Sequence, residues 1–249
     1  MKYAVCLRGI SYLTRTYRDS DTPFTIDFNE VASLIQKNII DDLRENGHTV
    51  DLFFYTYDSI MLKEYIDLMN PKKVDIRILD LSVGDGNSPN IVKIWFNSLK
   101  VALDYEKETN IKYDYFISIR FDHLYFEKIS NLCLPSDAIS ALQKGDDLFN
   151  VIPSQMMYPF LNTLQKMYVN KDIVHTYGDN FNRNGYKCNN LYSVPKDFNR
   201  RLMPLHHINR SVFIDKNHPF KEFNLEDLLN PNSDCYVYTL KPSKEPIYT

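Results

Sequence analysis

An arginine and an aspartate stand two residues apart, as Arg120-Phe121-Asp122, directly after the apolar segment 115–119. A carboxylate at a strand end can hold a divalent metal, and a guanidinium can hold a phosphate or a second carboxylate. Residues two apart on a strand point to the same side of the pleat, so both side chains can face one ligand. The alternative is an ion pair or a capping carboxylate at the strand end, which for a single Arg-x-Asp is the commoner arrangement.

The segment before this pair predicts a strand in the middle of a sheet. Phe116, Ile117 and Ile119 put apolar side chains on both faces, which is typical of a strand covered by helices on both sides. In open α/β sheets, ligands bind at the carboxyl ends of such strands. The pattern therefore places Arg120 and Asp122 where a ligand site is expected.

The first half of the chain alternates predicted strands with predicted helices. Strands are expected at 3–7, 50–57, 74–79 and 115–119, and helices at 29–46, 61–69 and 91–108. The stretches 11–28 and 84–89 are polar or contain glycine and proline, and are expected to be loops. This alternation predicts an α/β fold with a mostly parallel central sheet flanked by helices.

The second half has weaker patterns. A short strand is expected at 145–152 and a helix at 154–168. Beyond Val169 the chain is rich in Asn and Tyr and is expected to be irregular, with a proline-containing tail from Lys241. The chain has neither a Gly-x-Gly-x-x-Gly turn nor a Walker-type phosphate loop, which argues against the dinucleotide-binding and P-loop folds built on them.

Composition excludes several classes of protein. With 249 residues, 44% hydrophobic and 24% charged, the chain can form one sizeable core or two small ones. A net charge of -3 without a long Lys/Arg block is not the footprint of a nucleic-acid binder. No apolar run is long enough to span a membrane, the N-terminus resembles a strand rather than a signal sequence, and the four cysteines form no Cys-x-x-Cys pair. A cytoplasmic protein is expected.

Four segments, taken in order, resemble a known group of proteins. They are Cys-Leu-Arg-Gly at 6–9, Asp-Leu-Phe-Phe-Tyr-Thr-Tyr at 51–57, Tyr-Asp-Tyr-Phe-Ile-Ser-Ile-Arg-Phe-Asp at 113–122, and Gly-Asp-Asp-Leu-Phe at 145–149. The chain is similar, over residues 1–165, to the small glycosyltransferase-like proteins of large DNA viruses and capsular polysaccharide clusters. Those proteins are built on the type-A glycosyltransferase fold. The motifs are moderately specific in combination and weak singly.

The resemblance implies one nucleotide-binding sheet, with residues 1–130 binding a UDP- or GDP-sugar and 131–249 forming the side for a glycan or glycoprotein acceptor. In that fold an Asp-x-Asp holds Mn or Mg against the donor diphosphate. Here Arg120 replaces the first Asp and only Asp122 matches, which leaves metal dependence open. A late histidine, His207 or its neighbour His206, is the candidate second metal ligand.

The resemblance also implies a set of donor-binding residues. In that fold the carboxyl ends of the first two strands cradle the base and the ribose. The matching residues are Arg8, Gly9, Tyr55, Thr56 and Tyr57. Lys93, near the start of the long helix, and Arg120 are candidates for contact with phosphate.

Glycosyl transfer also needs a group that takes the proton of the acceptor hydroxyl, which is usually a carboxylate in an inverting enzyme. Asp146 and Asp147 precede a predicted strand, and adjacent side chains there can face opposite ways. A solvated pair in a turn is the alternative, and Asp179 is the fallback candidate.

Three functions are therefore open. The first is a nucleotide-sugar-dependent glycosyltransferase. The second is a sugar-nucleotide-binding protein that has lost catalysis, which the replacement at Arg120 suggests. The third is a metal-dependent phosphohydrolase that uses Asp122 with Asp146 or Asp147, although the sequence lacks the denser Asp/His clustering of two-metal sites.

Overall fold

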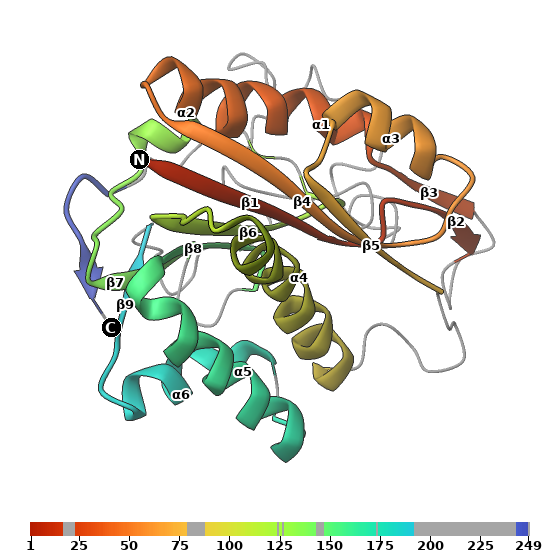
Figure 1. Ribbon diagram of the computed structural model, residues 1–249. Coiled ribbons are helices and arrows are strands. Elements are labelled where there is room, and N and C mark those ends of the chain that lie inside the picture. The colour runs from red at the N-terminus through yellow and green to blue at the C-terminus, as the bar shows by residue number, and fades with distance from the viewer. Residues whose placement is uncertain are drawn as a thin grey trace, which may run out of the picture.

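The computed structural model describes residues 1–16, 23–78, 88–123, 125, 127–142, 147–172, 174–191 and 243–248. Its centre is an eight-stranded mixed sheet, most of whose strand pairs are parallel. Helices cover both faces, with α1, α2 and α3 on one side and α4, α5 and α6 on the other (Figure 1). The expected α/β architecture is confirmed at this level.

The secondary structure follows the chain as two sets of elements. The strands are β1 (Lys2–Gly9), β2 (Tyr12–Thr16), β3 (Pro23–Asp27), β4 (Thr49–Tyr57), β5 (Lys73–Arg77), β6 (Tyr115–Arg120), β7 (Ala138–Ala141), β8 (Phe149–Pro153), β9 (Lys187–Asn190) and β10 (Ile247–Tyr248). The helices are α1 (Asn29–Ile35), η1 (Gln36–Asp41), α2 (Asp42–Glu45), α3 (Leu62–Met69), α4 (Ser88–Thr109), η2 (Ile129–Asn131), η3 (Ser154–Met156), α5 (Met157–Asn170), η4 (Val174–Thr176) and α6 (Tyr177–Arg183).

The sheet has a topological switch point, where successive strands are added first on one side of β1 and then on the other. The order across the sheet is β10-β9-β7-β8-β6-β1-β4-β5. From β1 the chain adds β4 and then β5 on one side, and returns to add β6 on the other side of β1. Strands β1, β4, β5 and β6 run parallel, whereas β8 is antiparallel to β6 and β7. Ligands of open α/β sheets bind at the carboxyl ends of the strands at such a switch point, here between β1 and β6.

One face of the sheet buries a cluster rich in aromatic rings. Val5 and Leu7 of β1 pack there with the helices α1 and α3. The rings of Phe28, Phe54 and Phe121 meet edge to face, with centroids 5.0 to 6.3 Å apart. Phe121 follows β6 directly, so its burial on this face fixes the chain at the strand exit.

The opposite face packs against α4 and α5. Ala4 and Cys6 lie in this second cluster together with Trp95 and Phe160, whose rings are 5.1 Å apart. Because side chains alternate along a strand, Arg8 continues this face at the carboxyl end of β1. The apolar surface of the central strands therefore ends in a charged group. Among the described helices, none is both long and apolar enough to cross a membrane.

Several elements differ from the prediction. Residues 12–16 and 23–27 form the antiparallel ribbon β2–β3, so the expected loop over 11–28 is wrong at these positions. Residues 24–27 do alternate apolar and polar side chains, as Phe-Thr-Ile-Asp, but the polar composition of the whole stretch outweighed this short pattern in the prediction. Strand β7 has only four residues, Ala-Ile-Ser-Ala, which do not alternate in this way. Helix α6 and strands β9 and β10 add regular structure where an irregular chain is expected.

The C-terminal residues return to the sheet. Strand β10 pairs antiparallel with β9, and Ile247 N–H donates to the side chain of Asn189, 2.7 Å away. Ser243 N–H donates to the carbonyl of Leu191 at 2.8 Å. Leu191 N–H in turn donates to the carbonyl of Ala141 in β7. The residues on both sides of 192–242 are therefore joined to each other at one edge of the sheet.

The predicted helix over 29–46 is continuous but has a π-helical middle, η1, between α1 and α2. The π turn buries Asn38, whose Nδ2 donates to the carbonyl of Tyr125 at 2.6 Å. Asp42 accepts from the backbone N–H and the hydroxyl of Ser130, at 2.8 and 3.0 Å. This helix therefore holds the segment that follows β6.

We expect the change Asp42→Ala to lower the free energy of unfolding by about 1–3 kcal/mol, because it leaves the N–H of Ser130 without its acceptor. Urea denaturation measures the difference. The neighbouring Asp41 lies half-exposed and pairs with Arg44 at 3.9 Å, so Asp41→Ala is the control and should cost less than about 1 kcal/mol. Similar losses for the two variants would contradict this role of Asp42.

Candidate functional site

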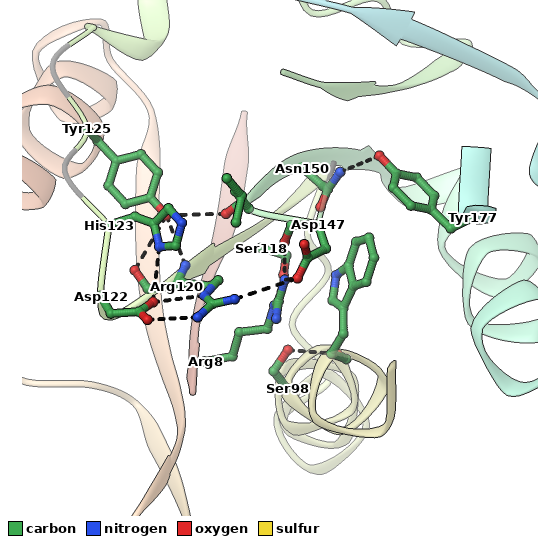
Figure 2. A network of polar contacts seen from close by, with 12 residues as sticks. Arg8, Ser98, Ser118, Arg120, Asp122, His123, Tyr125, Asp147, Asn150 and Tyr177 are labelled. Carbon is green, nitrogen blue, oxygen red and sulfur yellow. Dashed lines mark hydrogen bonds and ion pairs between the residues drawn. The ribbon is translucent and has the colours of Figure 1, made fainter. Parts of the chain in front are cut away.

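Charged side chains meet at the switch point between β1 and β6. Arg8 and Arg120 are register partners at the carboxyl ends of these strands. We call the group formed by Arg8, Ser118, Arg120, Asp122, His123 and Asp147 the polar network, and Figure 2 shows its members converging from three segments of the chain. These segments are the end of β1, the end of β6 with its following turn, and the residues just before β8.

Arg8 is the buried member of the arginine pair, only 2% exposed. Its Nε donates to Ser118 Oγ at 3.2 Å, and its Nη2 donates to the backbone carbonyl of Asp147 and lies 3.4 Å from Asp147 Oδ2. The guanidinium carbon is 5.0 Å from the ring centre of Trp95, a cation–π contact. Burial lowers the pKa of Arg8, which the charge of Asp147 opposes. Because an arginine stays charged in proteins, Asp147 is its counter-ion.

Arg120 and Asp122 form a two-point ion pair. The Nε and Nη2 of Arg120 donate to the two carboxylate oxygens of Asp122, at 2.8 and 2.7 Å. The alternative that the sequence leaves open, an ion pair at the strand end, is therefore present. Burial tends to raise the pKa of Asp122, but Arg120 and then His123 outweigh it and hold that pKa well below its usual value. Arg120 Nη1 also lies 3.9 Å from Asp147 Oδ2.

His123 completes the arrangement, although the sequence did not single it out. Its Nδ1 is 3.0 Å from Asp122 Oδ1, and its ring is fully buried. Burial lowers the pKa of His123 despite the opposing effect of Asp122. The neutral ring therefore donates from Nδ1 and keeps Nε2 as an acceptor. Its position directly after Asp122 was the signal that would have identified it.

Tyr125 ties the turn after β6 to the start of β8. The N–H of Arg120 donates to the Tyr125 hydroxyl at 2.9 Å, and this hydroxyl donates to the carbonyl of Leu148 at 3.3 Å. Burial raises the pKa of Tyr125, so it remains a neutral donor. Hydrogen bonds of Tyr125 to the backbone therefore hold the polar network in place, in addition to the contacts among its side chains.

The network continues toward α6 through residues that sequence reasoning missed. Asn150 of β8 is the register partner of Ser118, and its Nδ2 donates to the hydroxyl of Tyr177 at 2.8 Å. Both side chains lie buried (Figure 2). The hydrogen bond joins strand β8 to helix α6, and no local sequence pattern marks it.

The other strand-end candidates divide between the edge and the interior. Thr56 Oγ1 donates to the carbonyl of Gly9 at 2.9 Å, which joins β4 to the exit of β1. Gly9 has φ +99, and a Cβ there would meet no atom of the described residues within 4 Å. Tyr57 is half-buried at the end of β4. Tyr55 is buried and accepts from Asn97 of α4, so it anchors that helix rather than facing the edge.

Lys93 and Asp179 are not brought into the polar network. Lys93 lies exposed in the second turn of α4, and Asp179 lies exposed in the first turn of α6. Asp146, His207 and its neighbour His206 fall outside the residues that the structure describes. Of the two adjacent carboxylates, Asp147 alone can therefore be placed.

Within the described residues, the side chains around Asp122 do not form a ligand set that suits Mn or Mg. Both ions take about six ligands, mostly oxygen in the case of Mg. Both oxygens of Asp122 are already engaged, by Arg120 and His123, and Asp147 lies against two guanidinium groups. Across the described ranges, no group of three or more His, Cys, Asp or Glu side chains is placed to hold a metal. The same pairing leaves Asp122 and Asp147 poorly placed for a two-metal phosphohydrolase site.

We expect Arg8→Met to lower the free energy of unfolding by about 3–5 kcal/mol, because it leaves Asp147 buried without its closest counter-ion. Arg44→Met is the control, since Arg44 is exposed and its ion pair is long, and should cost less than about 1 kcal/mol. Urea denaturation at neutral pH compares the two variants. Equal losses would show that the buried pair contributes no more than a surface pair.

The lowered pKa of His123 gives a pH dependence of stability. Below a pH of about 6.5 the unfolded chain binds a proton at this residue that the folded chain does not, so the free energy of unfolding falls by up to about 1.4 kcal/mol per pH unit. The contribution of Asp122 is lost only below its ordinary pKa of 3.8, a separate range. Urea denaturation between pH 5 and 7.5 should show a smaller slope for His123→Asn, which retains a donor near Nδ1. An unchanged slope would contradict the assignment.

Comparison with known proteins leaves the family of this chain open. No protein-family model matches it, and no curated protein sequence matches it. The resemblance noted from the strand-end motifs therefore rests on those motifs alone. What the site does must be argued from its geometry.

Proposed function

We propose that this protein is a glycosyltransferase that moves a sugar from a UDP- or GDP-sugar to a glycan acceptor. The observation that carries the proposal is the polar network at the carboxyl ends of β1 and β6, where the strand order of an open α/β sheet favours ligand binding. The architecture is compatible with the type-A glycosyltransferase fold. The ordered motifs at the ends of β1, β4 and β6 support the same choice.

In the proposed complex, the diphosphate of the UDP- or GDP-sugar lies beside Arg120. Its side chain is 18% exposed, whereas those of Arg8, Asp122 and Asp147 are 2 to 4% exposed. Arg120 is thus the most exposed member of these two ion pairs. As the glycosidic bond breaks, the diphosphate gains negative charge, which a fixed guanidinium stabilises. The chain exit at Gly9, with Tyr57 near it, is the proposed place for the base and ribose, and the buried Thr56 supports that exit through its hydrogen bond to Gly9.

Asp147 is the base candidate that the structure describes. It lies beside Arg120, so a carboxylate and the proposed diphosphate group share one site. In the proposed reaction it accepts the proton of the acceptor hydroxyl as that oxygen bonds to the anomeric carbon. The nucleoside diphosphate leaves with the electrons of the broken bond.

A second function is favoured by one specific observation. Asp147 is buried and forms ion pairs with Arg8 at 3.4 Å and Arg120 at 3.9 Å. A carboxylate held in this way orients the two arginines, which suits a protein that binds sugar nucleotides without transferring the sugar. The two functions differ in turnover and share the binding site.

A panel of UDP- and GDP-sugars, scored by the nucleoside diphosphate released, separates them. For a transferase we expect Asp147→Asn to lower kcat by about 10²–10⁴-fold while nucleotide binding persists. Asp75→Asn, which alters an exposed ion pair with Arg77, is the control and should leave kcat unchanged. Nucleotide binding without release from any donor would favour the binding protein. If calorimetry detects no binding of any nucleoside diphosphate, with or without Mn, both functions are refuted.

A further inference from the structure

We infer that Arg120 takes the place of the divalent metal, so that the donor diphosphate binds directly to its guanidinium and nucleotide binding needs no metal ion. The inference rests on the proposed function and concerns the same site. It assigns Asp122 and His123 as positioning residues for Arg120 rather than as metal ligands.

Arg120 still has N–H groups that can donate hydrogen bonds to a ligand. A guanidinium has five N–H groups. Asp122 accepts two of them, one from Nε and one from Nη2. Within the described part of the chain no hydrogen bond uses the other three, since Nη1 lies 3.9 Å from the nearest oxygen of Asp147. Two phosphate oxygens can be bound by the two Nη atoms without breaking the pair with Asp122.

The ion pair of Arg120 and Asp122 is oriented with the arginine toward the more exposed side. The side chain of Asp122 is buried, with 3% exposed, whereas the side chain of Arg120 is 18% exposed. The pair therefore presents its positive end to a ligand. Asp122 is held in turn by His123 Nδ1, and the N–H of Arg120 by the Tyr125 hydroxyl. The guanidinium plane is thus fixed before a ligand arrives, so little side-chain freedom is lost on binding.

A metal ion could bind the carboxylate of Asp122 only by displacing its present partners. A cation on either oxygen of Asp122 would compete with Arg120 or with the His123 N–H for that oxygen. It would also stand beside the guanidinium, and two neighbouring cations repel each other. Breaking the pair to admit a metal would leave Arg120 without its main counter-ion. The arrangement is therefore built around the guanidinium.

Isothermal titration calorimetry of the full chain with UDP and GDP tests the inference. We expect the same Kd in EDTA and in added Mn or Mg. Arg120→Lys should weaken binding by about tenfold or more in EDTA, because lysine keeps the charge but loses the planar pair of donors. Arg44→Lys, at an exposed arginine, is the control and should bind as the wild type does.

The outcomes separate the inference from the proposed function. Binding by the wild type only when metal is added overturns the inference and leaves the glycosyltransferase proposal standing. An unchanged Kd for folded Arg120→Lys also overturns the inference. Absence of binding under both conditions refutes the proposed function itself. The comparison of EDTA with metal uses the wild type, so it decides the matter even if Arg120→Lys does not fold.

Discussion

Two arginines at neighbouring strand ends impose the main constraint on this structure. Arg8 and Arg120 are register partners on parallel strands, and adjacent strands lie about 4.7–4.9 Å apart. Each guanidinium disfavours the other: burial lowers the pKa of Arg8, and the charge of Arg120 lowers it further. Both can be retained only because Asp147 and Asp122 supply compensating charge. The positions of the turn after β6 and of the chain before β8 follow from this need.

This constraint also connects the two halves of the chain. Asp147 lies 139 residues after Arg8 and pairs with it across the sheet. The antiparallel entry of β8 beside β6 brings the carboxylate there, and Tyr125 joins the same two segments through Leu148. The second half of the chain thus supplies one counter-ion of the site, and the first half supplies both arginines. Neither half contains the balanced site alone.

The sequence predicted the elements that have strong periodicity. The strands β1, β4 and β6 and the helices α3, α4 and α5 lie close to their expected positions, because each has apolar residues at strand or helix spacing. The ribbon β2–β3 was missed because the polar composition of its stretch outweighed the short alternation at 24–27, and strand β7 was missed because its four residues do not alternate. The π turn at η1 was missed because Ile35, Ile39 and Leu43 are spaced four residues apart, a spacing that also suits an α-helix.

The site was predicted in part. The position of Arg120 and Asp122 at a strand end followed from local pattern, but their engagement with each other is a matter of side-chain geometry that spacing leaves open. Tyr55 was assigned to the edge, yet the alternation of the strand turns it toward α4. Ser118 and Trp95 were missed because their role depends on Arg8, which reaches them through tertiary contacts.

The hydrogen bond between Ser243 and Leu191 has a consequence for how the chain is connected. Since these residues touch, the backbone at 191 and the backbone at 243 lie side by side at the edge of the sheet. A linker of a few residues is long enough to connect them. Strand β10 is therefore attached to the rest of the molecule by its pairing with β9 as well as by its covalent link.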